Sequence, residues 1–375
     1  MSYKASFQKK TFLFKQPSGT SRGVLTEKHA WFISLSKINT NHPTIHHSSP
    51  ESFRDVTHSS SPVSRKLSGR PSEPVEESLG ECSIIPGLSP DFVDFDSYEK
   101  KLTEVCENIN YYIKNLSELE LYPSILFGLE TALLGLQSQN ENQLFDTPFT
   151  RRDLGIPING LIWMGTKEFM QQQIEEKLQA GFSCLKLKIG ALDFETELEI
   201  LASIRKRYTA SDIELRVDAN GAFSPADVLE KLERLSKFQL HSIEQPIKAG
   251  QWEEMAKICG VTPLPIALDE ELIGVVGNAQ KSELLETIQP QYIILKPSLH
   301  GGILGTSEWI HLAMEHKIPW WMTSALESNV GLNCVAQFAS TFENVLPQGL
   351  GTGGLYENNT SSKLFIDQGY IYMGQ

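Results

Sequence analysis

From Ile156 onward, short apolar runs rich in β-branched residues alternate with stretches of helical periodicity, and this alternation restricts the fold more than any other feature of the chain. Strands separated by helices predict a parallel sheet, because a parallel neighbour is reached through a crossover connection. Seven or eight such units in about 200 residues favour a closed α/β barrel of the TIM type over an open sheet. The expected barrel covers residues 151–348, with strands at 158–164, 184–189, 213–218, 240–244, 265–269, 292–296 and 319–323.

The first 150 residues follow a different pattern, in which three strands precede two helices. Strands are expected at 10–23, 24–35 and 79–87, and amphipathic helices at 98–118 and 123–137. Strands followed by helices are typical of a small α+β unit. The sequence therefore predicts a separate α+β domain over residues 1–150.

An insert interrupts this first domain between residues 36 and 74. It is dense in Ser, Pro and His and contains few apolar residues. Such a composition cannot bury enough apolar surface to offset its ordering entropy, so we expect a disordered segment at a hairpin tip. A metal site is a weaker interpretation, because no carboxylate is paired with its histidines, His42, His46, His47 and His58.

The composition restricts the partners and the location of the protein. The 33 Lys and Arg residues against 46 Asp and Glu give a net charge of −13, which argues against a nucleic-acid-binding surface. No apolar run approaches the length needed to span a bilayer, and the start of the chain lacks the features of a signal peptide, so we expect no membrane association and a cytoplasmic location. The five scattered cysteines predict reduced thiols rather than disulfides or a zinc site.

Charged residues stand where the predicted barrel strands end, and the carboxyl ends of barrel strands face a common site. From Lys188 onward, these positions are 30, 26, 25 and 27 residues apart, about one strand–helix unit each. A single Asp at such a place usually caps the next helix, but three converging carboxylates need a cation to offset their repulsion. Oxygen ligands favour Mg²⁺, with Mn²⁺ as the alternative. The residues are Lys186, Lys188, Asp218, Glu244, Asp269 and Lys296.

Two of these lysines, Lys186 and Lys188, alternate with apolar residues in the run CLKLKI. In an antiparallel strand they would lie on the solvated face, which is the ordinary interpretation. In a barrel strand the same face points into the barrel interior. Lysines placed there need acidic neighbours, and a functional role is the expected reason for them. A nearby cation or second ammonium group lowers a lysine pKa, which allows the side chain to act as a general base.

These positions lie in motifs that resemble the enolase superfamily, in its muconate-lactonizing subgroup: KLK (186–188), VDAN (217–220), IEQP (243–246), ALDE (267–270), LKP (295–297) and TSALESNVGL (323–332). The resemblance implies a (β/α)7β barrel with an N-terminal α+β capping domain, and a C-terminal segment, 349–375, that packs back on the capping domain. Within the superfamily, the segments 17–28, 80–91, 127–134 and 348–359 are similar to the o-succinylbenzoate synthase family.

That family implies a hydro-lyase that removes water from a small carboxylate substrate in menaquinone biosynthesis. By motif, Lys188 is the implied base and Lys296 the cation on the opposite side of the substrate ring. Asp218, Glu244 and Asp269 are the implied ligands of Mg²⁺, and the bound ion is implied to stabilise an enolate. The implied supporting or substrate-positioning residues are Lys186, Asn220, Glu270 and Ser324.

Three alternatives remain open at the level of sequence. An N-acylamino acid racemase or dipeptide epimerase would use the same fold and site, since two opposed lysines suit 1,1-proton transfer. The acidic DxD motif that would hold a dipeptide ammonium group is missing from GLGTGG (349–354). A muconate lactonizer is a further alternative. A non-catalytic scaffold is disfavoured because every metal and lysine position is filled.

Overall fold

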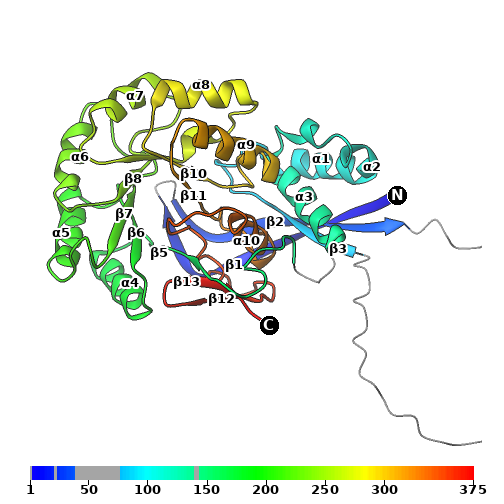
Figure 1. The fold of residues 1–375 in the computed structure, drawn as a ribbon, viewed down its shortest axis with the longest axis horizontal. Coiled ribbons are helices and arrows are strands. Elements are labelled where there is room, and N and C mark those ends of the chain that lie inside the picture. The colour runs from blue at the N-terminus through cyan, green and yellow to red at the C-terminus, as the bar shows by residue number, and fades with distance from the viewer. Residues whose placement is uncertain (1, 21–22, 39–76, 139–142) are drawn as a thin grey trace, which may run out of the picture.

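The computed structural model describes residues 2–20, 23–38, 77–138 and 143–375. The chain forms a barrel surrounded by helices and a second, strand-based unit packed beside it (Figure 1). The barrel sheet contains the seven predicted strands, all parallel, in the order of the chain. They are β5 (Gly160–Ile162), β6 (Cys184–Lys188), β7 (Glu214–Asp218), β8 (Ser242–Glu244), β9 (Ile266–Leu268), β10 (Tyr292–Leu295) and β11 (Trp320–Met322).

A short eighth segment, Gln348–Gly349, closes the barrel. It forms parallel bridges to Thr323 after β11 and to Ile158 before β5. Gly349 N donates to Met322 O at 2.7 Å, and Gln348 N donates to Pro157 O at 2.8 Å, so the closing segment is bonded on both edges. The arrangement confirms the (β/α)7β barrel and leaves the first and last strands of the sheet covered.

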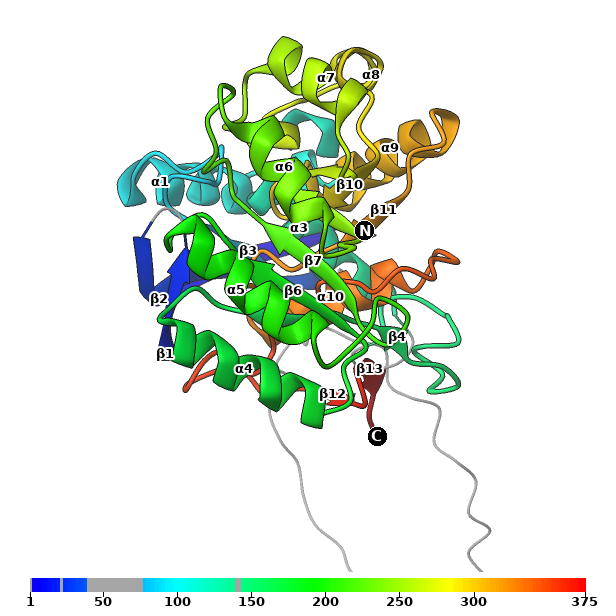
Figure 2. The ribbon, with the colours of Figure 1, turned by 90° about the vertical axis from the view of Figure 1, so that its left-hand side faces the viewer.

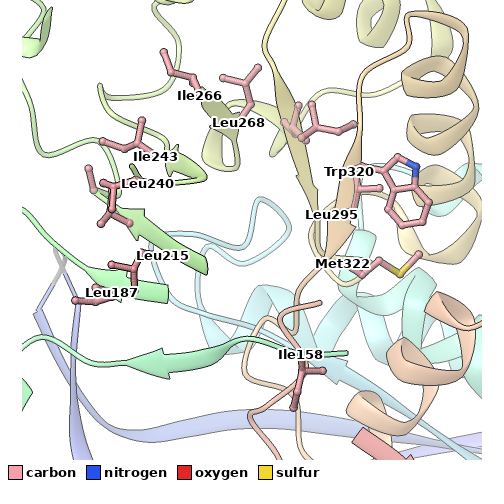
Figure 3. Close-up of a cluster of buried hydrophobic side chains, with 14 of the residues drawn as sticks. Ile158, Leu187, Leu215, Leu240, Ile243, Ile266, Leu268, Leu295, Trp320 and Met322 are labelled. Carbon is pink, nitrogen blue, oxygen red and sulfur yellow. The ribbon is translucent and has the colours of Figure 1, made fainter. Parts of the chain in front are cut away.

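Each strand from β5 to β11 is followed by a helix that covers the outside of the barrel (Figures 1 and 2). Apolar side chains from successive strands, such as Leu187, Leu215, Ile243 and Leu295, belong to one buried core (Figure 3). Because side chains alternate along a strand, the residues next to them point into the barrel. The helices are α4 (Lys167–Gln179), α5 (Phe194–Arg205), α6 (Val228–Ser236), α7 (Trp252–Val261), α8 (Asn278–Ile288), α9 (Gly302–Glu315) and α10 (Asn329–Ala339), with the 3₁₀ helix η2 (Glu270–Leu272) between β9 and α8.

The capping domain is an antiparallel three-stranded sheet with helices packed against it. Its strands are β1 (Ser2–Thr20), β2 (Gly23–Ile38) and β3 (Glu77–Ser83), in the order β1-β2-β3. Helix α3 (Pro123–Gln137) spans the predicted range. It lies very close to β3, because Gly80 and Gly128 face each other and a Cβ on Gly80 would lie 1.7 Å from the Gly128 carbonyl oxygen.

The other predicted helix of this domain, 98–118, is divided into three pieces. They are α1 (Phe95–Glu107), α2 (Ile109–Tyr112) and the 3₁₀ helix η1 (Leu116–Leu119). The first break falls at Asn108, whose backbone leaves the helical region and whose side-chain amide donates to the Glu104 carbonyl at 2.9 Å. Asparagine competes with helix propagation through such local hydrogen bonds, which apolar periodicity alone does not report.

Two carboxylates of the capping domain, the buried Glu81 and the half-buried Glu130, dock it onto helix N-termini of the barrel. Glu130 on α3 accepts from the Ile303 and Leu304 amides at 2.6 and 3.0 Å, at the start of α9. Glu81 on β3 accepts from the Ser328 and Gly331 amides, both at 2.8 Å, at the start of α10. Unpaired amides and the helix dipole make a helix N-terminus a favourable place for a carboxylate.

The segment 349–375 contacts both parts of the molecule. Residues 355–358 run beside β1, where Lys15 N donates to Leu355 O at 2.9 Å. The terminal hairpin, β12 (Leu364–Asp367) and β13 (Tyr370–Met373), pairs instead with β4 (Ile156–Pro157) next to the barrel (Figure 2). Residues 355–358 thus lie against the capping domain, whereas the terminal hairpin forms a separate three-stranded sheet with β4.

The predicted insert falls mostly outside the described residues, as do the four histidines within it. Strand β2 continues to Ile38, so the first residues assigned to the insert belong to the sheet. Ser36 pairs with Glu77 of β3, which shows that the insert joins two adjacent antiparallel strands. In the parts of the chain that the structure describes, no helix has both the length and the apolar character to cross a membrane.

Candidate active site

Acidic and basic side chains meet at the carboxyl ends of β6, β7 and β8. The ammonium group of Lys186 lies 2.6 Å from Glu244 Oε2 and 3.1 Å from Asp218 Oδ2. Lys188 contacts the same Asp218 oxygen at 2.6 Å. Asp218 and Glu244 are almost completely buried, so these charges interact with little solvent screening. The two lysines are thus linked through a shared carboxylate.

The same arrangement continues on the next two strands. Lys296, directly after β10, donates to Asp269, directly after β9, and both side chains are buried. Asn220 connects the two halves, because its Oδ1 accepts from Lys188 at 2.8 Å and its Nδ2 donates to Glu270 at 3.0 Å. The structure therefore brings together the three acids, the three lysines, Asn220 and Glu270 in one continuous network.

The ionic contacts shift the pKa values of these groups. Burial alone would raise the pKa of Asp218, but Lys188 and Lys186 lower it below its ordinary range. Burial and the neighbouring Asp218 charge raise the pKa of Glu244. Burial would lower the pKa of Lys186 and of Lys296, but their carboxylate partners raise both. For Lys186, the sequence predicts a lowered pKa through a nearby cation or second ammonium group; in this structure carboxylates are its nearest charges, and they raise its pKa.

The donor set at these strand ends fits a hard divalent ion. Glu244 Oε1 and Asp269 Oδ1 are buried and receive no hydrogen bond from any described residue. Oxygen atoms of this kind are the ligands that Mg²⁺ takes. Among the residues that the structure describes, no three acidic, His or Cys side chains form a ready metal cage, and ammonium groups pair with the carboxylates instead. An ion would therefore have to displace part of this pairing.

A pocket opens above this network, between the barrel and the capping domain. Its floor includes Lys186, Lys188, Asn220 and Lys296. The capping domain contributes apolar residues from β2 and from the segment after β3, and the barrel contributes residues that follow β11 and the closing segment. The remaining lining residues are Gly23, Val24, Leu25, Ile85, Pro86, Leu88, Asn159, Leu161, Trp163, Thr323, Ser324, Ala325, Leu326, Gly349, Gly351 and Thr352.

Comparison with known proteins identifies the family. Residues 169–374 match the family described as enolase C-terminal domain-like. The chain is 45% identical over 398 aligned positions to the o-succinylbenzoate synthase of Desulfotalea psychrophila, with 98% of each chain covered. The chain belongs to the o-succinylbenzoate synthase family. Its fold also matches the crystal structure of MenC from Desulfotalea psychrophila, with a TM-score of 0.79, 39% identity, and 99% and 100% of the two chains covered.

Epimerases share the fold of this o-succinylbenzoate synthase family member without close sequence similarity. The dipeptide epimerase of Enterococcus faecalis, crystallised with Mg and the dipeptide L-Leu-L-Tyr, superimposes with a TM-score of 0.77 at 16% identity, over 100% of this chain and 98% of the other. A likeness at this identity describes the fold alone. The family assignment thus favours the synthase over the epimerase alternative.

Ser324 occupies a different place from the other predicted residues of this synthase family member. It lines the pocket, but its hydroxyl donates to Glu327 Oε2 at 2.6 Å and has no contact with the lysines. Glu327 also accepts from Ser298 at 2.6 Å. Ser324 therefore belongs to a buried polar group beside the pocket rather than to the ionic network.

Sequence reasoning missed Gln245, which supports the ionic network from behind. Its Oε1 accepts from the Asp269 amide at 3.1 Å, and its Nε2 donates to Glu271 at 2.9 Å. Its φ of 39° lies in the left-handed region, which is uncommon for a residue other than glycine. The available signal was its place next to Glu244 in IEQP, but nothing in that motif indicates which strand its amide reaches.

Three polar atoms on the opposite wall of the pocket were also missed. Asn159 Oδ1, Thr323 Oγ1 and Thr352 Oγ1 are buried and have no hydrogen-bond partner among the described residues. Asn159 precedes β5, Thr323 follows β11 and Thr352 follows the closing segment, so the three come from adjacent parts of the barrel. Buried polar atoms without partners are costly, so a group bound in the pocket, a water or a ligand, would be favoured beside them. We call these three residues the neutral wall.

Proposed function

We propose that this chain catalyses the reaction of its family, the loss of water from 2-succinyl-6-hydroxy-2,4-cyclohexadiene-1-carboxylate to give 2-succinylbenzoate, with Lys188 as the base. The observation that carries the proposal is the position of Lys188 and Lys296. Both line one pocket, from β6 and from the end of β10, with the three carboxylates on the strands between them. A ring bound in this pocket has a lysine on either side.

The proton transfer steps are assigned to Lys188. In its neutral form, Lys188 Nζ takes the proton from the ring carbon that bears the carboxylate. The electron pair of that C–H bond moves toward the carboxylate, and the C–O bond of the ring hydroxyl then breaks. The departing oxygen receives the proton from Lys188 Nζ and leaves as water, which restores the base. The hydrogen bonds to Asp218 and Asn220 orient this side chain.

Lys296 presents a positive charge to the negative charge that develops on the substrate. Its ammonium group is buried and donates to Asp269, which holds it in place on the side of the pocket away from Lys188 and suits an electrostatic role better than that of a second base. A divalent ion held by Asp218, Glu244 and Asp269, most suitably Mg²⁺, would supply further positive charge beside the substrate carboxylate.

The neutral wall supports an orientation for the substrate. The substrate carries a second carboxylate at the end of its succinyl arm, and the hydroxyl groups of Thr323 and Thr352 can donate to it. This orientation directs the ring carboxylate to the acid-and-lysine side and the succinyl arm to the opposite side of the pocket. Thr323→Val and Thr352→Val should each lower kcat/KM by about tenfold, because a hydrogen bond to a charged group is lost. Unchanged kcat/KM in both variants would contradict the orientation.

An ultraviolet assay for the aromatic product tests the proposed function. The purified protein is given the cyclohexadiene substrate with added Mg²⁺, and again after exhaustive chelation. We expect rapid appearance of 2-succinylbenzoate with the metal and loss of the reaction without it. A negative assay together with clean epimerisation of dipeptides by the same preparation would overturn the proposal.

A further inference from the structure

Lys28 is a buried lysine of the capping domain that the proposed chemistry does not use. It lies on β2 and is 5% exposed. Its ammonium group donates to the carbonyl oxygens of Ala325 and Leu326, both at 2.7 Å, and to the Ser83 hydroxyl. These three acceptors use all three protons of the ammonium group. A strand of the capping domain is thereby bonded to the barrel loop between β11 and α10.

The loop that Lys28 holds contains a strained residue. Leu326 has a φ of 61°, in the left-handed region that residues with a branched side chain rarely adopt. Such a conformation persists only where the surroundings impose it. The Leu326 carbonyl receives a second hydrogen bond, from the Tyr356 hydroxyl at 2.6 Å. Two buried donors therefore fix the backbone at Leu326.

The strand that carries Lys28 and the loop to which Lys28 donates both form walls of the active-site pocket. Val24 and Leu25, close to Lys28 on β2, line it from the capping domain, and Ala325 and Leu326 line it from the barrel. Leu326 and Leu25 also pack against one small apolar cluster, which contains Phe12, Phe14, Ala30 and Tyr356. The position of one wall thus depends on the position of the other, and Lys28 connects the two.

Two buried acids compensate the charge of Lys28. Burial lowers the pKa of this lysine, and Glu327 and Glu81 oppose the shift. Glu327 is held by the Ser298 and Ser324 hydroxyls, and Glu81 by the start of α10. The lysine therefore lies within an organised polar group at the domain boundary.

We propose that Lys28 is a positioning residue of the active site, which holds the strained Ala325–Leu326 segment against β2 and so fixes the width of the pocket above the lysines. The inference rests on the proposed function only in taking this pocket as the substrate site. The Lys28 ammonium group donates to Ser83, Ala325 and Leu326, and not to the three carboxylates of the ionic network, so its effect reaches the reaction through the pocket wall.

The test compares Lys28→Met, which keeps an unbranched apolar side chain and removes the ammonium group, with Lys28→Arg, which keeps the charge. Glu130→Gln is the matched control, because it alters another polar contact between the capping domain and the barrel that involves no pocket residue. Two readouts are measured: amide hydrogen exchange of a peptide covering 323–328 in the substrate-free protein, and the separate values of kcat and KM in the dehydration assay.

For Lys28→Met we expect exchange in 323–328 to rise about tenfold or more and KM to rise about tenfold, with a smaller change in kcat. Lys28→Arg should recover part of both effects, and Glu130→Gln should change neither. If Lys28→Met lowers the thermal midpoint but leaves exchange and KM at wild-type values, Lys28 is a domain contact alone and the proposal is wrong.

Tyr356→Phe keeps the proposal testable if Lys28→Met does not fold. It removes one of the two donors to the Leu326 carbonyl and retains the ring, so a smaller rise in exchange at 323–328 and in KM is expected. No change in either quantity would contradict the proposal. If the wild-type protein fails to dehydrate the substrate while Lys28→Met still raises amide hydrogen exchange in 323–328, the positioning role stands and the proposed function fails.

Discussion

The barrel and the capping domain line one pocket with different chemistry. The barrel contributes lysines, Asn220 and the neutral wall, which lie on strands bonded on both edges or next to their ends. The capping domain contributes apolar residues such as Val24, Leu25 and Ile85. The groups that react are thus placed by the sheet itself, whereas the enclosure of the substrate depends on how a second domain is docked. Charge changes in the barrel should therefore have larger effects than changes in the capping domain.

The largest expected effect follows from the three carboxylates. Asp218→Asn, Glu244→Gln and Asp269→Asn should each lower turnover by about a thousandfold, because several kcal/mol of charge stabilisation beside the substrate carboxylate are lost. Mg²⁺ binding, measured by calorimetry on the substrate-free protein, should weaken in each variant. Full activity after exhaustive chelation would show that the acids serve another purpose.

The two lysines should separate into a base and a fixed charge. Lys188→Arg keeps the charge but cannot give up a proton at working pH, so turnover should fall on the order of a thousandfold. Lys296→Arg keeps the charge that the substrate needs and should retain measurable activity, whereas Lys296→Ala should lose about a hundredfold.

Deuterium exchange gives an independent measurement of the same distinction. Exchange from solvent into a slow substrate analogue should occur at one face and disappear in Lys188→Arg. Near-normal dehydration by Lys188→Arg would contradict the assignment of the base, and Lys186, which shares Asp218 with it, would be the next residue to test.

The difference between the two domains also explains what the sequence could predict. In the barrel, each acid directly ends or follows a short apolar run, and such runs recur at nearly constant intervals, so the strands and their final residues could be predicted together. The structure contains every predicted barrel strand and brings the three acids and three lysines into one network.

Contacts between distant segments could not be predicted in this way. Lys28 and Ala325 are almost 300 positions apart, and only the docked structure makes the lysine a partner of that loop. The sole sequence signal is that Lys28 shares a strand face with buried Ala30. The neutral wall was missed for a related reason, since it is formed across the closing segment, which is too short to show a strand pattern.

A smaller effect is expected where the capping domain docks on α9. Burial raises the pKa of Glu130 to about 7, above its ordinary value of 4.5. The protonated form is thus favoured on folding, and the stability that it contributes is present below about pH 4.5 and lost as the pH rises through about 7. Glu130→Gln removes this dependence. The free energy of unfolding of the variant should therefore rise relative to that of the wild type as the pH increases, by at most about 3 kcal/mol.

Thermal midpoints of the wild type and Glu130→Gln at pH 5, 6, 7 and 8 measure this effect. The two proteins should be similar at pH 5 and diverge in favour of the variant toward pH 8, with kcat and KM unaffected by the substitution. A difference in midpoint that stays constant over this range would show that Glu130 does not change protonation on folding.

The smallest effect is expected from the insert of the capping domain. Deleting residues 39–73 leaves Pro74, Val75 and Glu76 as a short connection between Ile38 of β2 and Glu77 of β3. These strands are already paired from Ser36–Glu77 onward, so the hairpin needs no new register. Shortening the connection lowers the loop-closure entropy cost, which should stabilise the capping domain by about 2 kcal/mol or less.

Steady-state kinetics and a thermal midpoint of the deletion variant separate two roles for the insert. Unchanged kcat and KM with an equal or higher midpoint are expected, because every pocket residue that the capping domain contributes lies at the start of β2 or after β3, away from the shortened end of the hairpin. A large rise in KM with the fold retained would show that the insert reaches the pocket and takes part in enclosing the substrate. The capping domain would then contribute more than an apolar wall, and the contrast with the barrel would weaken accordingly.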